Sequence, residues 1–533
     1  MKTNPNRFWF LVILLGWAFD FLFWEKPAGL NFFLYVIFCL STGIYLLQTD
    51  GLRLARPSSL LLLPILFLST MTFLRQEMLT VFLSVAMTLF LMGVFAITYL
   101  SGQWTRFGLI DYFLGYLFLF GSMIARPLGF VADVRRAEPD VSPKRNSNFL
   151  PIVRGIIIAL PVIAIFASLL SSADIIFADR LEKFMDVFNI DNLPEYIFRL
   201  VYILVFAYAL AGTFLHAAQK SNEQVDEKPR FSPFLGFTES AIVLGSVVIL
   251  FAAFVAIQFQ YFFGGQSNIN IEGYTYAEYA RNGFGELVAV AFFSLLMLLG
   301  LGAITRRDTE SQAKTFSSLG VVLVGLVIVM LVSAFQRLVL YESAYGFSRL
   351  RTYTHVFMIW LALLLVTVVV LEIIRRERAA GLAMVLASLG FVVSLTLLNV
   401  DAFIVKQNVQ RELRGDADKS LTQGERVELD AQYFLDLSDD AVPALASAFQ
   451  NKSLPVAVRE KVGAALFCKR YDREQDKRKI PWQSFNLARF NADNIFADIK
   501  KDLDVYKITD KDWPVKINTP SGEEFSCYQY YYD

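Results

Sequence analysis

Long runs of apolar residues recur along the first three quarters of the chain. Twelve of them meet or approach the length of about 20 residues that an α-helix needs to cross a bilayer. They lie near residues 8–24, 30–47, 58–74, 78–100, 107–124, 155–177, 196–215, 237–261, 284–304, 316–335, 353–374 and 382–398. Because a backbone group in lipid finds no water to bond, each run is predicted to be helical. Strands of a membrane barrel would instead alternate apolar and polar residues, which these runs do not do.

The pattern changes after Leu398. Residues 401–533 contain no long apolar run and are rich in charged side chains. The stretch 429–449 has helical spacing that is interrupted at residues 438–440, which is typical of an N-cap before a second helix. A further helix is predicted over 454–470, and the tail from Lys511 is expected to be loop or short strand.

These patterns predict an all-α fold with two domains. Residues 1–400 are expected to form a transmembrane helical bundle of 11–12 spans, and residues 401–533 a soluble C-terminal domain of mainly helical hairpins. Composition agrees, since only 18% of the residues are charged, against about 25% in soluble proteins. The formal net charge is zero, so no overall field attracts nucleic acid, and no such partner is expected. Helical hairpins commonly serve protein contacts, so 401–533 is a candidate surface for a protein partner.

Lysine and arginine in the connections predict the orientation, because basic loops stay on the cytoplasmic side. Four basic connections, each separated from the next by two apolar runs, lie at 125–154, 216–230, 305–315 and 375–378. Basic residues near the N-terminus conflict with this side if all five preceding runs cross. We therefore expect run 107–124, which contains Asp111, to lie in the membrane interface. That gives eleven spans with the C-terminal domain outside; twelve spans with both ends inside is the alternative.

The cysteines and histidines predict no metal or cofactor site. Cys39, Cys468 and Cys527 are too few for a tetrahedral cysteine zinc site. Cys468 and Cys527 would pair in an oxidising compartment and stay free elsewhere. His216 and His355 stand singly at the ends of runs, so no haem or histidine zinc site is expected.

Recognisable catalytic motifs are missing from the sequence. It contains no phosphate-binding loop, no dinucleotide glycine pattern and no nucleophile elbow. We assign no catalytic residue, and the sequence favours a role other than catalysis without excluding an enzyme.

Two polar clusters lie where apolar runs meet the predicted outer face. The first precedes and enters the run at 284 and the second separates the runs 316–335 and 353–374. The first contains Tyr276, Glu278, Tyr279, Arg281 and Glu286, and the second contains Arg337, Tyr341, Glu342, Tyr345 and Arg351. Charges at membrane depth are costly, so Glu286 and Arg337 are expected to neutralise each other. Together the clusters predict a binding site for a polar head group or an ion. For any single residue, a side chain that reaches out to the membrane surface is the structural alternative.

The same residues resemble motifs of bacterial multi-span membrane proteins, the domain-of-unknown-function families four-one-five-three and four-one-seven-three. The motifs include Tyr276-x-x-Tyr279-Ala280-Arg281, Arg337-x-x-x-Tyr341-x-x-x-Tyr345-Gly346, Phe23-Trp24-x-x-Pro27-x-Gly29-Leu30-Asn31, Leu398-Asn399-x-Asp401-Ala402-Phe403-Ile404-x-x-x-Asn408-x-x-Arg411, Ser438-x-Asp440-Ala441 and Trp482-x-x-x-Asn486-Leu487-x-Arg489. The resemblance spans nearly the whole chain. It implies a multi-pass protein of the bacterial cytoplasmic membrane and brings no established activity or catalytic residues.

Three classes of function remain. The favoured one is a non-enzymatic protein that binds or senses something at its outer face and recruits a partner through residues 401–533. A secondary transporter of a small polar or ionic solute would use Glu286, Arg337 or Glu239 as its coupling site. A membrane transferase acting on a lipid-linked substrate would use Glu278 or Asp174 as a general base.

Overall fold

The computed structural model of the protein describes residues 4–137, 159, 163, 166–174, 176–181, 192–219, 233–263, 284–414, 429–476 and 479–528. Within these residues, eleven helices are long and apolar enough to cross a membrane. The prediction of an all-α, multi-pass membrane protein is therefore confirmed.

The membrane-length helices follow the apolar runs of the sequence. They are α1 (Pro5–Phe23), α2 (Leu30–Thr49), α3 with α4 (Arg56–Ser59 and Leu62–Leu74), α5 (Met78–Thr98), α6 (Leu109–Ala137), α9 (Leu193–Ala217), α10 (Phe237–Phe263), α12 (Phe284–Ile304), α13 (Glu310–Tyr345), α14 (Arg349–Ile373) and α15 (Ala380–Leu398). Each corresponds to one predicted run. The remaining run, 155–177, lies only partly within the described residues.

Helix α6 bears on the number of spans. The run 107–124, which we expected to lie in the interface, forms the first part of this helix, and residues 109–134 are long and apolar enough to cross a membrane. Its length therefore gives no reason to exclude it from the bilayer. Whether it crosses stays open between the two topologies.

Contacts divide the chain into two units. The first comprises residues 1–25, 38–53 and 117–219. Within it α1 packs along α9. The two helices approach closely at Gly16, where a Cβ atom would lie 2.6 Å from the Ile203 carbonyl oxygen. Asp20, which is buried, forms an ion pair with Arg199 at 2.5 Å between Oδ2 and Nη2.

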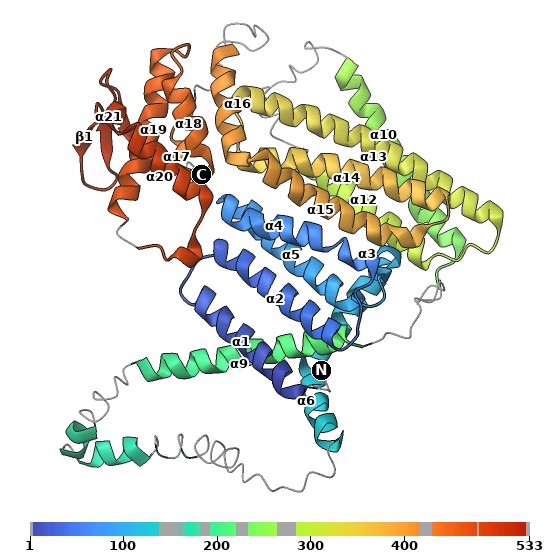
Figure 1. Cartoon of the computed structure of the whole chain (residues 1–533). Helices are drawn as coiled ribbons and strands as arrows, with labels where there is room; N and C mark the ends of the chain where they lie inside the picture. Colours follow the sequence, from blue (N-terminus) through green and yellow to red (C-terminus); the bar gives the residue numbers. More distant parts are fainter. Residues whose placement is uncertain are drawn as a thin grey trace. The chain divides into compact units, whose positions relative to one another are not determined.

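The second unit comprises residues 26–37, 54–116 and 220–533. Its membrane helices pack in the order α10 and α12 on α13, then α14, α15, α5 and α4 (Figure 1). The described turns 75–77, 305–309, 346–348 and 374–379 are short, so the helices that each of them joins run antiparallel. Buried leucines and valines of α12, α13 and α14 fill the space between these helices.

The C-terminal part of this unit combines helices with a small sheet. Its elements are α16 (Val400–Arg414), α17 (Tyr433–Asp436), η5 (Asp439–Ala441), α18 (Val442–Gln450), α19 (Val456–Gln475), η6 (Trp482–Ser484), α20 (Leu487–Asp498), α21 (Lys500–Leu503), β1 (Lys507–Asp510), β2 (Lys516–Asn518) and β3 (Glu524–Ser526). The strands form one antiparallel sheet in the order β1-β2-β3. The interruption predicted at 438–440 occurs there, with Ser438 accepting a hydrogen bond from the Asp440 N–H. That residues 401–533 are soluble stays a prediction.

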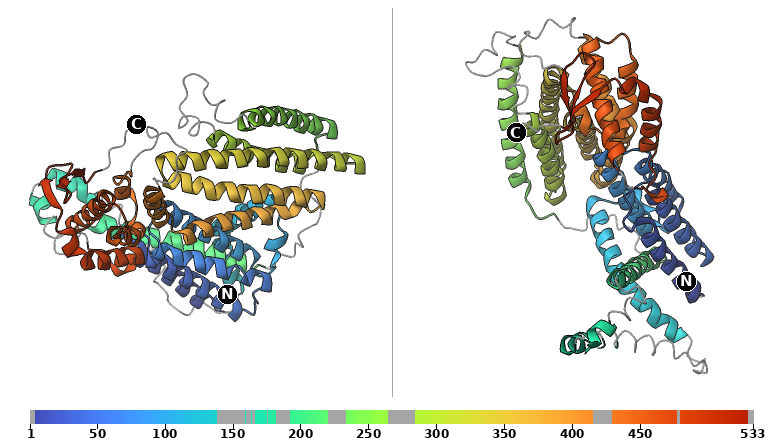
Figure 2. Two further views of the ribbon diagram at one scale, coloured as in Figure 1. Left: turned by 90° about the horizontal axis from the view of Figure 1, so that it is seen from above. Right: turned by 90° about the vertical axis from the view of Figure 1, so that its left-hand side faces the viewer.

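The membrane helices of the second unit have two different ends. One end, here called the docking end, comprises the turns 75–77 and 346–348 together with Asn399, and the C-terminal helices lie against it (Figures 1 and 2). The other, here called the basic end, comprises 99–108, 305–309 and 374–379, and it carries the basic residues Arg106, Arg306, Arg307, Arg375, Arg376 and Arg378. Ion pairs hold the basic end together, among them Arg378 with Asp111 at 2.8 Å.

Candidate functional site

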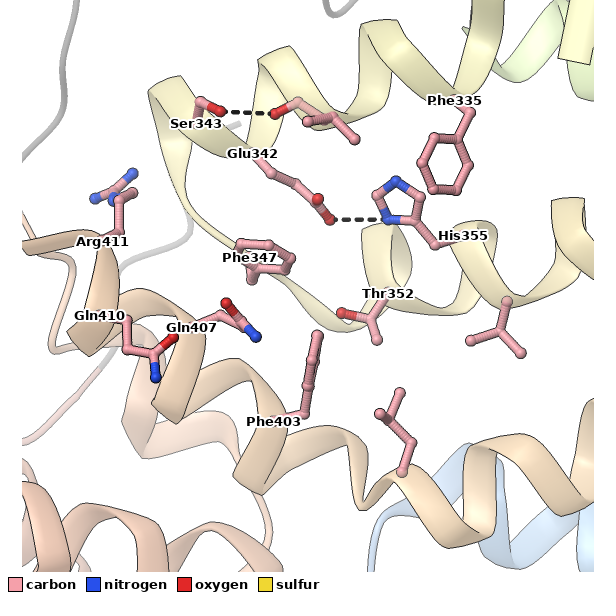
Figure 3. A pocket seen from close by; sticks show the side chains of 13 residues that line it. Phe335, Glu342, Ser343, Phe347, Thr352, His355, Phe403, Gln407, Gln410 and Arg411 are labelled. Atoms are coloured by element: carbon pink, nitrogen blue, oxygen red, sulfur yellow. Dashed lines mark hydrogen bonds and ion pairs between the residues drawn. The ribbon is translucent and has the colours of Figure 1, made fainter. Parts of the chain in front are cut away.

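A cavity of about 450 Å³ opens at the docking end of the second unit. It lies between the end of α13, the start of α14, the end of α15 and α16 (Figure 3). The lining is mainly apolar and includes the rings of Phe335, Phe347 and Phe403. Its polar members are Glu342, Ser343, Thr352, His355, Gln407, Gln410 and Arg411. A mostly apolar cavity with a few convergent polar groups is the usual form of a small-molecule site.

Glu342 is the carboxylate of this cavity, and it is almost completely buried at 2% exposure. Its Oε1 lies 3.3 Å from Nδ1 of His355, one helix away. No residue that the structure describes donates a hydrogen bond to Glu342 Oε1, and His355 Nε2 is likewise buried without a partner there. A buried polar atom without a hydrogen bond is costly. A ligand that supplies hydrogen bonds to Glu342 Oε1 and His355 Nε2 would therefore be favoured in this cavity.

Next to the cavity, Tyr341, Tyr345 and Arg351 form a stack. The Arg351 guanidinium lies 4.0 Å above the centre of the Tyr341 ring, and the Tyr341 and Tyr345 rings meet edge to face at 5.0 Å. Arg351 also donates a hydrogen bond to the Gly346 carbonyl oxygen. The structure thus brings together four members of the second predicted cluster, with Glu342 facing the cavity and the other three bracing the α13–α14 turn.

The first predicted cluster is only partly described. Tyr276, Glu278, Tyr279 and Arg281 lie outside the described residues. Glu286 is exposed in the first turn of α12. Its expected pairing with Arg337 of α13 stays a prediction.

The other charged candidates, Glu239, Asp174 and Glu372, lie outside the cavity and are exposed, cap a turn or form an ion pair. Glu239 is exposed in the first turn of α10 at the basic end. Asp174 accepts hydrogen bonds from the N–H groups of Ile176 and Phe177, at 2.7 and 3.1 Å, as a capping residue does. Glu372 is buried and paired with Arg307.

Asn408 fixes the wall of the cavity. Its amide oxygen accepts a hydrogen bond from the Phe347 N–H at 2.6 Å, and its Nδ2 donates to the Phe347 carbonyl at 3.0 Å. Both backbone polar groups of one turn residue are therefore held by a single side chain of α16. This contact ties the first helix of the C-terminal part to the turn between two membrane helices.

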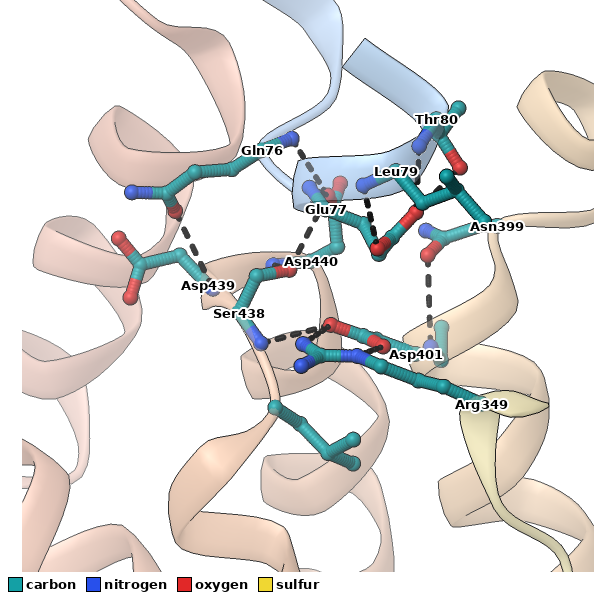
Figure 4. A network of polar contacts seen from close by, with 12 residues as sticks. Gln76, Glu77, Leu79, Thr80, Arg349, Asn399, Asp401, Ser438, Asp439 and Asp440 are labelled. Carbon is teal, nitrogen blue, oxygen red and sulfur yellow. Dashed lines mark hydrogen bonds and ion pairs between the residues drawn. The ribbon is translucent and has the colours of Figure 1, made fainter. Parts of the chain in front are cut away.

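A second polar network lies beside the cavity and centres on Asp401 (Figure 4). Asp401 is fully buried, and its two oxygens accept hydrogen bonds from Nε and Nη2 of Arg349 at 2.8 and 2.6 Å. The N–H of Ser438 also donates to it at 2.6 Å. Such two-point pairing of guanidinium and carboxylate is strong and directional, so the start of α14 and the C-terminal helices are held in one geometry.

The turn between α4 and α5 joins the same network. Oδ2 of buried Asp440 accepts hydrogen bonds from the N–H groups of Gln76 and Glu77, at 2.6 and 3.1 Å. Gln76 accepts a hydrogen bond from the Asp439 N–H at 3.2 Å in return. The Glu77 carboxylate caps α5 by accepting hydrogen bonds from the N–H groups of Leu79 and Thr80.

The segment before α20 makes a third contact with membrane helices. The Leu30 N–H, at the start of α2, donates to the Phe485 carbonyl at 3.0 Å. The Asn486 amide donates to the Arg75 carbonyl at 2.8 Å. Ser484 donates to the Pro27 carbonyl at 2.9 Å. Gly29 is needed here, since a side chain at this position would lie 2.8 Å from the Phe485 carbonyl oxygen.

Burial shifts several pKa values in the C-terminal part. It raises the pKa of Asp440 despite the hydrogen bond from Gln76, and it raises the pKa of Tyr433, whose hydroxyl accepts a hydrogen bond from the Arg349 N–H. Burial lowers the pKa of Lys469 to about 8. This ammonium donates to the carbonyls of Leu435 and Leu437.

Two features of the site were missed from the sequence. His355 was read as an isolated histidine, because its carboxylate partner is thirteen positions away on another helix. Asp401, Asn408 and Asp440 appeared only as motif letters. No group of three potential metal ligands occurs among the described residues.

Cys468 and Cys527 form a disulfide with their Cα atoms 5.2 Å apart, one of the two alternatives left by the sequence. The bond joins α19 to the residue that follows β3. It therefore ties the small sheet to the C-terminal helices.

Comparison with known proteins gives one match. Residues 62–448 match the family model described as Domain of unknown function (DUF4153). The matched residues include the cavity, Asp401 and Asp440. The chain matches no curated protein and no solved structure.

Proposed function

Because the chain belongs to the DUF4153 family, whose description assigns no activity, we propose its function from the geometry of the docking end. The proposal is a non-enzymatic membrane protein that binds a ligand in the docking-end cavity and presents a protein-binding surface on its C-terminal part. Ligand occupancy would alter that surface.

One observation carries this proposal: α16 lines the cavity and also contacts the C-terminal helices. It supplies Phe403, Gln407, Gln410 and Arg411 to the cavity lining. One turn earlier it supplies Asp401, which holds Ser438 of the C-terminal helices. A shift of α16 on ligand binding would therefore be felt at the contacts of α17 and α18, since packed helices move as rigid elements.

Hydrogen–deuterium exchange tests the coupling. We expect peptides of α18–α20 to exchange at different rates in nanodiscs of total membrane lipid extract and in nanodiscs of phosphatidylcholine alone, because only the extract supplies natural ligands. The double variant Arg349→Met, Asp401→Leu should abolish the difference, because it breaks the link at Asp401 without leaving a buried charge, whereas Lys314→Met, at an exposed lysine, should retain it. Equal exchange of these peptides in both lipids would contradict a sensing role.

A second candidate is favoured by the buried Glu342–His355 pair. A carboxylate and an imidazole in contact inside a membrane bundle are typical of proton relays, so a proton-coupled transporter would place its coupling site here, and not at the exposed Glu286 or Glu239. Solute flux into reconstituted vesicles under an imposed pH gradient, lost in Glu342→Gln, would favour this candidate over the sensor.

A further inference from the structure

We propose that the docking-end cavity binds an amphiphile with a cationic amine head group, which Glu342 would receive. This inference rests on the proposed function, because it names the class of ligand for the same cavity.

The charged side chains of the cavity lining favour a cationic ligand. Glu342 is the one carboxylate of the described lining, it is buried on α13, and its Oε1 accepts no hydrogen bond from the described residues. The other charged side chain of the lining, apart from His355, is Arg411, which forms an ion pair with Glu412 at 3.3 Å. Of the lining carboxylate and guanidinium, the group left to be met by a ligand is therefore the Glu342 carboxylate.

His355 favours the same ligand. Its Nδ1 lies 3.3 Å from Glu342 Oε1 without forming a hydrogen bond, so the imidazole leaves that oxygen available to a donor of the ligand. An ammonium group offers three donors in one small head, which is what an under-bonded buried carboxylate requires.

The rest of the lining suits an apolar body. Phe335 meets the His355 ring edge to face at 4.5 Å, and Phe347 meets Phe403 at 5.7 Å. The faces of such rings attract cations, and their bulk excludes water. A volume of about 450 Å³ is within the usual range for ligand sites. A compact amine with a short alkyl or aromatic body, or the ammonium head of a lipid, would fit this chemistry.

Binding of tritiated octylamine to the full chain in phosphatidylcholine nanodiscs tests the proposal. We expect saturable binding above that of empty nanodiscs, competed by unlabelled octylamine and not by N-octylacetamide, which has the same chain without the charge. Glu342→Gln, which keeps the shape of the side chain, should weaken binding by roughly tenfold or more, the range of a charge-assisted hydrogen bond. Glu310→Gln, at an exposed carboxylate, should bind like the wild type.

A second arm distinguishes the source of the amine. If a lipid head group is the natural ligand, nanodiscs containing phosphatidylethanolamine will lower the apparent affinity for octylamine in the wild type and not in Glu342→Gln. An unchanged affinity assigns the site to a free amine. The thermal unfolding midpoint of Glu342→Gln should equal or exceed that of the wild type, since the variant removes an unsatisfied charge, and this separates lost binding from lost folding.

Two results would overturn the proposal: equal octylamine affinity in Glu342→Gln and the wild type, or competition by N-octylacetamide as strong as by octylamine. Either could occur while the lipid-dependent exchange of α18–α20 persists. In that case the sensing role would stand with a ligand of another class.

Discussion

Asp401 joins the start of α14 to the C-terminal helices at the docking end. It has no exposed surface, and it receives two hydrogen bonds from Arg349 and one from the Ser438 backbone. A carboxylate can remain charged at such depth only when its partners replace water fully. Arg349 and the Ser438 N–H likewise lose their acceptor if the Asp401 carboxylate is removed.

Asp401→Ala should therefore destabilise the protein severely. It leaves the Arg349 guanidinium and the Ser438 N–H without their acceptor, at a cost of about 3–5 kcal/mol for breaking a buried pair. We expect a lower thermal unfolding midpoint in detergent and faster protease cleavage within 429–476. Glu310→Ala, on an exposed pair, serves as the control. The double variant Arg349→Met, Asp401→Leu should regain part of the loss, and a single variant as stable as the wild type would contradict the argument.

Lys469 predicts a pH dependence of stability. Burial lowers its pKa to about 8 in the folded chain, against 10.5 for a free lysine. Between these values the unfolded chain binds more protons than the folded one, so the free energy of unfolding rises with pH over this window, by at most about 3 kcal/mol. Below pH 8 the full penalty is present.

Chemical denaturation at pH 7.5, 8.5 and 9.5 measures this rise. Lys469→Met should flatten it, because no proton is then exchanged at that position, whereas methionine at the exposed Lys501 should leave it unchanged. A wild-type chain whose stability falls steadily from pH 7.5 to 9.5 would contradict the assignment.

At the scale of elements, the turn between α13 and α14 shows how tightly the cavity wall is built. Gly346 has φ +82°, and a Cβ at this position would lie 2.8 Å from Asn408 Oδ1. That oxygen is already engaged with the Phe347 N–H. A side chain here would therefore strain the backbone and push α16 away from the turn.

Gly346→Ala should cost about 2–4 kcal/mol, the sum of positive-φ strain and the lost Asn408 contact. Gly522→Ala is the matched control, since Gly522 has φ +89° but no atom within 4 Å of its would-be Cβ, and it should cost only the strain of about 1 kcal/mol. The two midpoints of unfolding check the difference, and octylamine binding should fall in Gly346→Ala alone. Equal losses in the two variants would show that the Asn408 contact contributes nothing.

The sequence predicted the elements better than the site, for a physical reason. Solvation by lipid acts on every residue of a span, so each run such as 353–374 indicates its helix without reference to the rest of the chain. The pairing of Glu342 with His355 depends on the crossing of α13 and α14, which no local pattern contains. The tail from Lys511 was expected to be loop or short strand, and β2 and β3 lie in it. Strand β1 and the pairing into one sheet were not predicted, because strands as short as Lys516–Asn518 carry too few residues for an alternation to be visible.

Among the described residues of the second unit, the two ends of its membrane helices differ in composition as well as in structure. The basic end gathers six arginines within 99–108, 305–309 and 374–379, whereas the turns 75–77 and 346–348 and Asn399 of the docking end carry one, Arg75. Basic connections are retained on the cytoplasmic side during insertion. The disulfide between Cys468 and Cys527 belongs to the part attached at the docking end, and such bonds persist in oxidising compartments.

Both features predict that the docking end and the C-terminal part face away from the cytoplasm, as the eleven-span topology requires. In a Cys39→Ser background, Cys527 should resist a membrane-impermeant maleimide on intact cells, because it is bonded to Cys468. It should become labelled after treatment with an impermeant reductant, since the reductant can reach it only from outside.

Asp308→Cys, introduced into the same background at an exposed position of the basic end, provides the opposite readout. This thiol should stay unlabelled on intact cells and react in inverted vesicles, because 305–309 joins two spans on the cytoplasmic side. Labelling at position 308 from outside, with Cys527 reactive only in inverted vesicles, would reverse the orientation. It would place the amine-binding cavity at the cytoplasmic face.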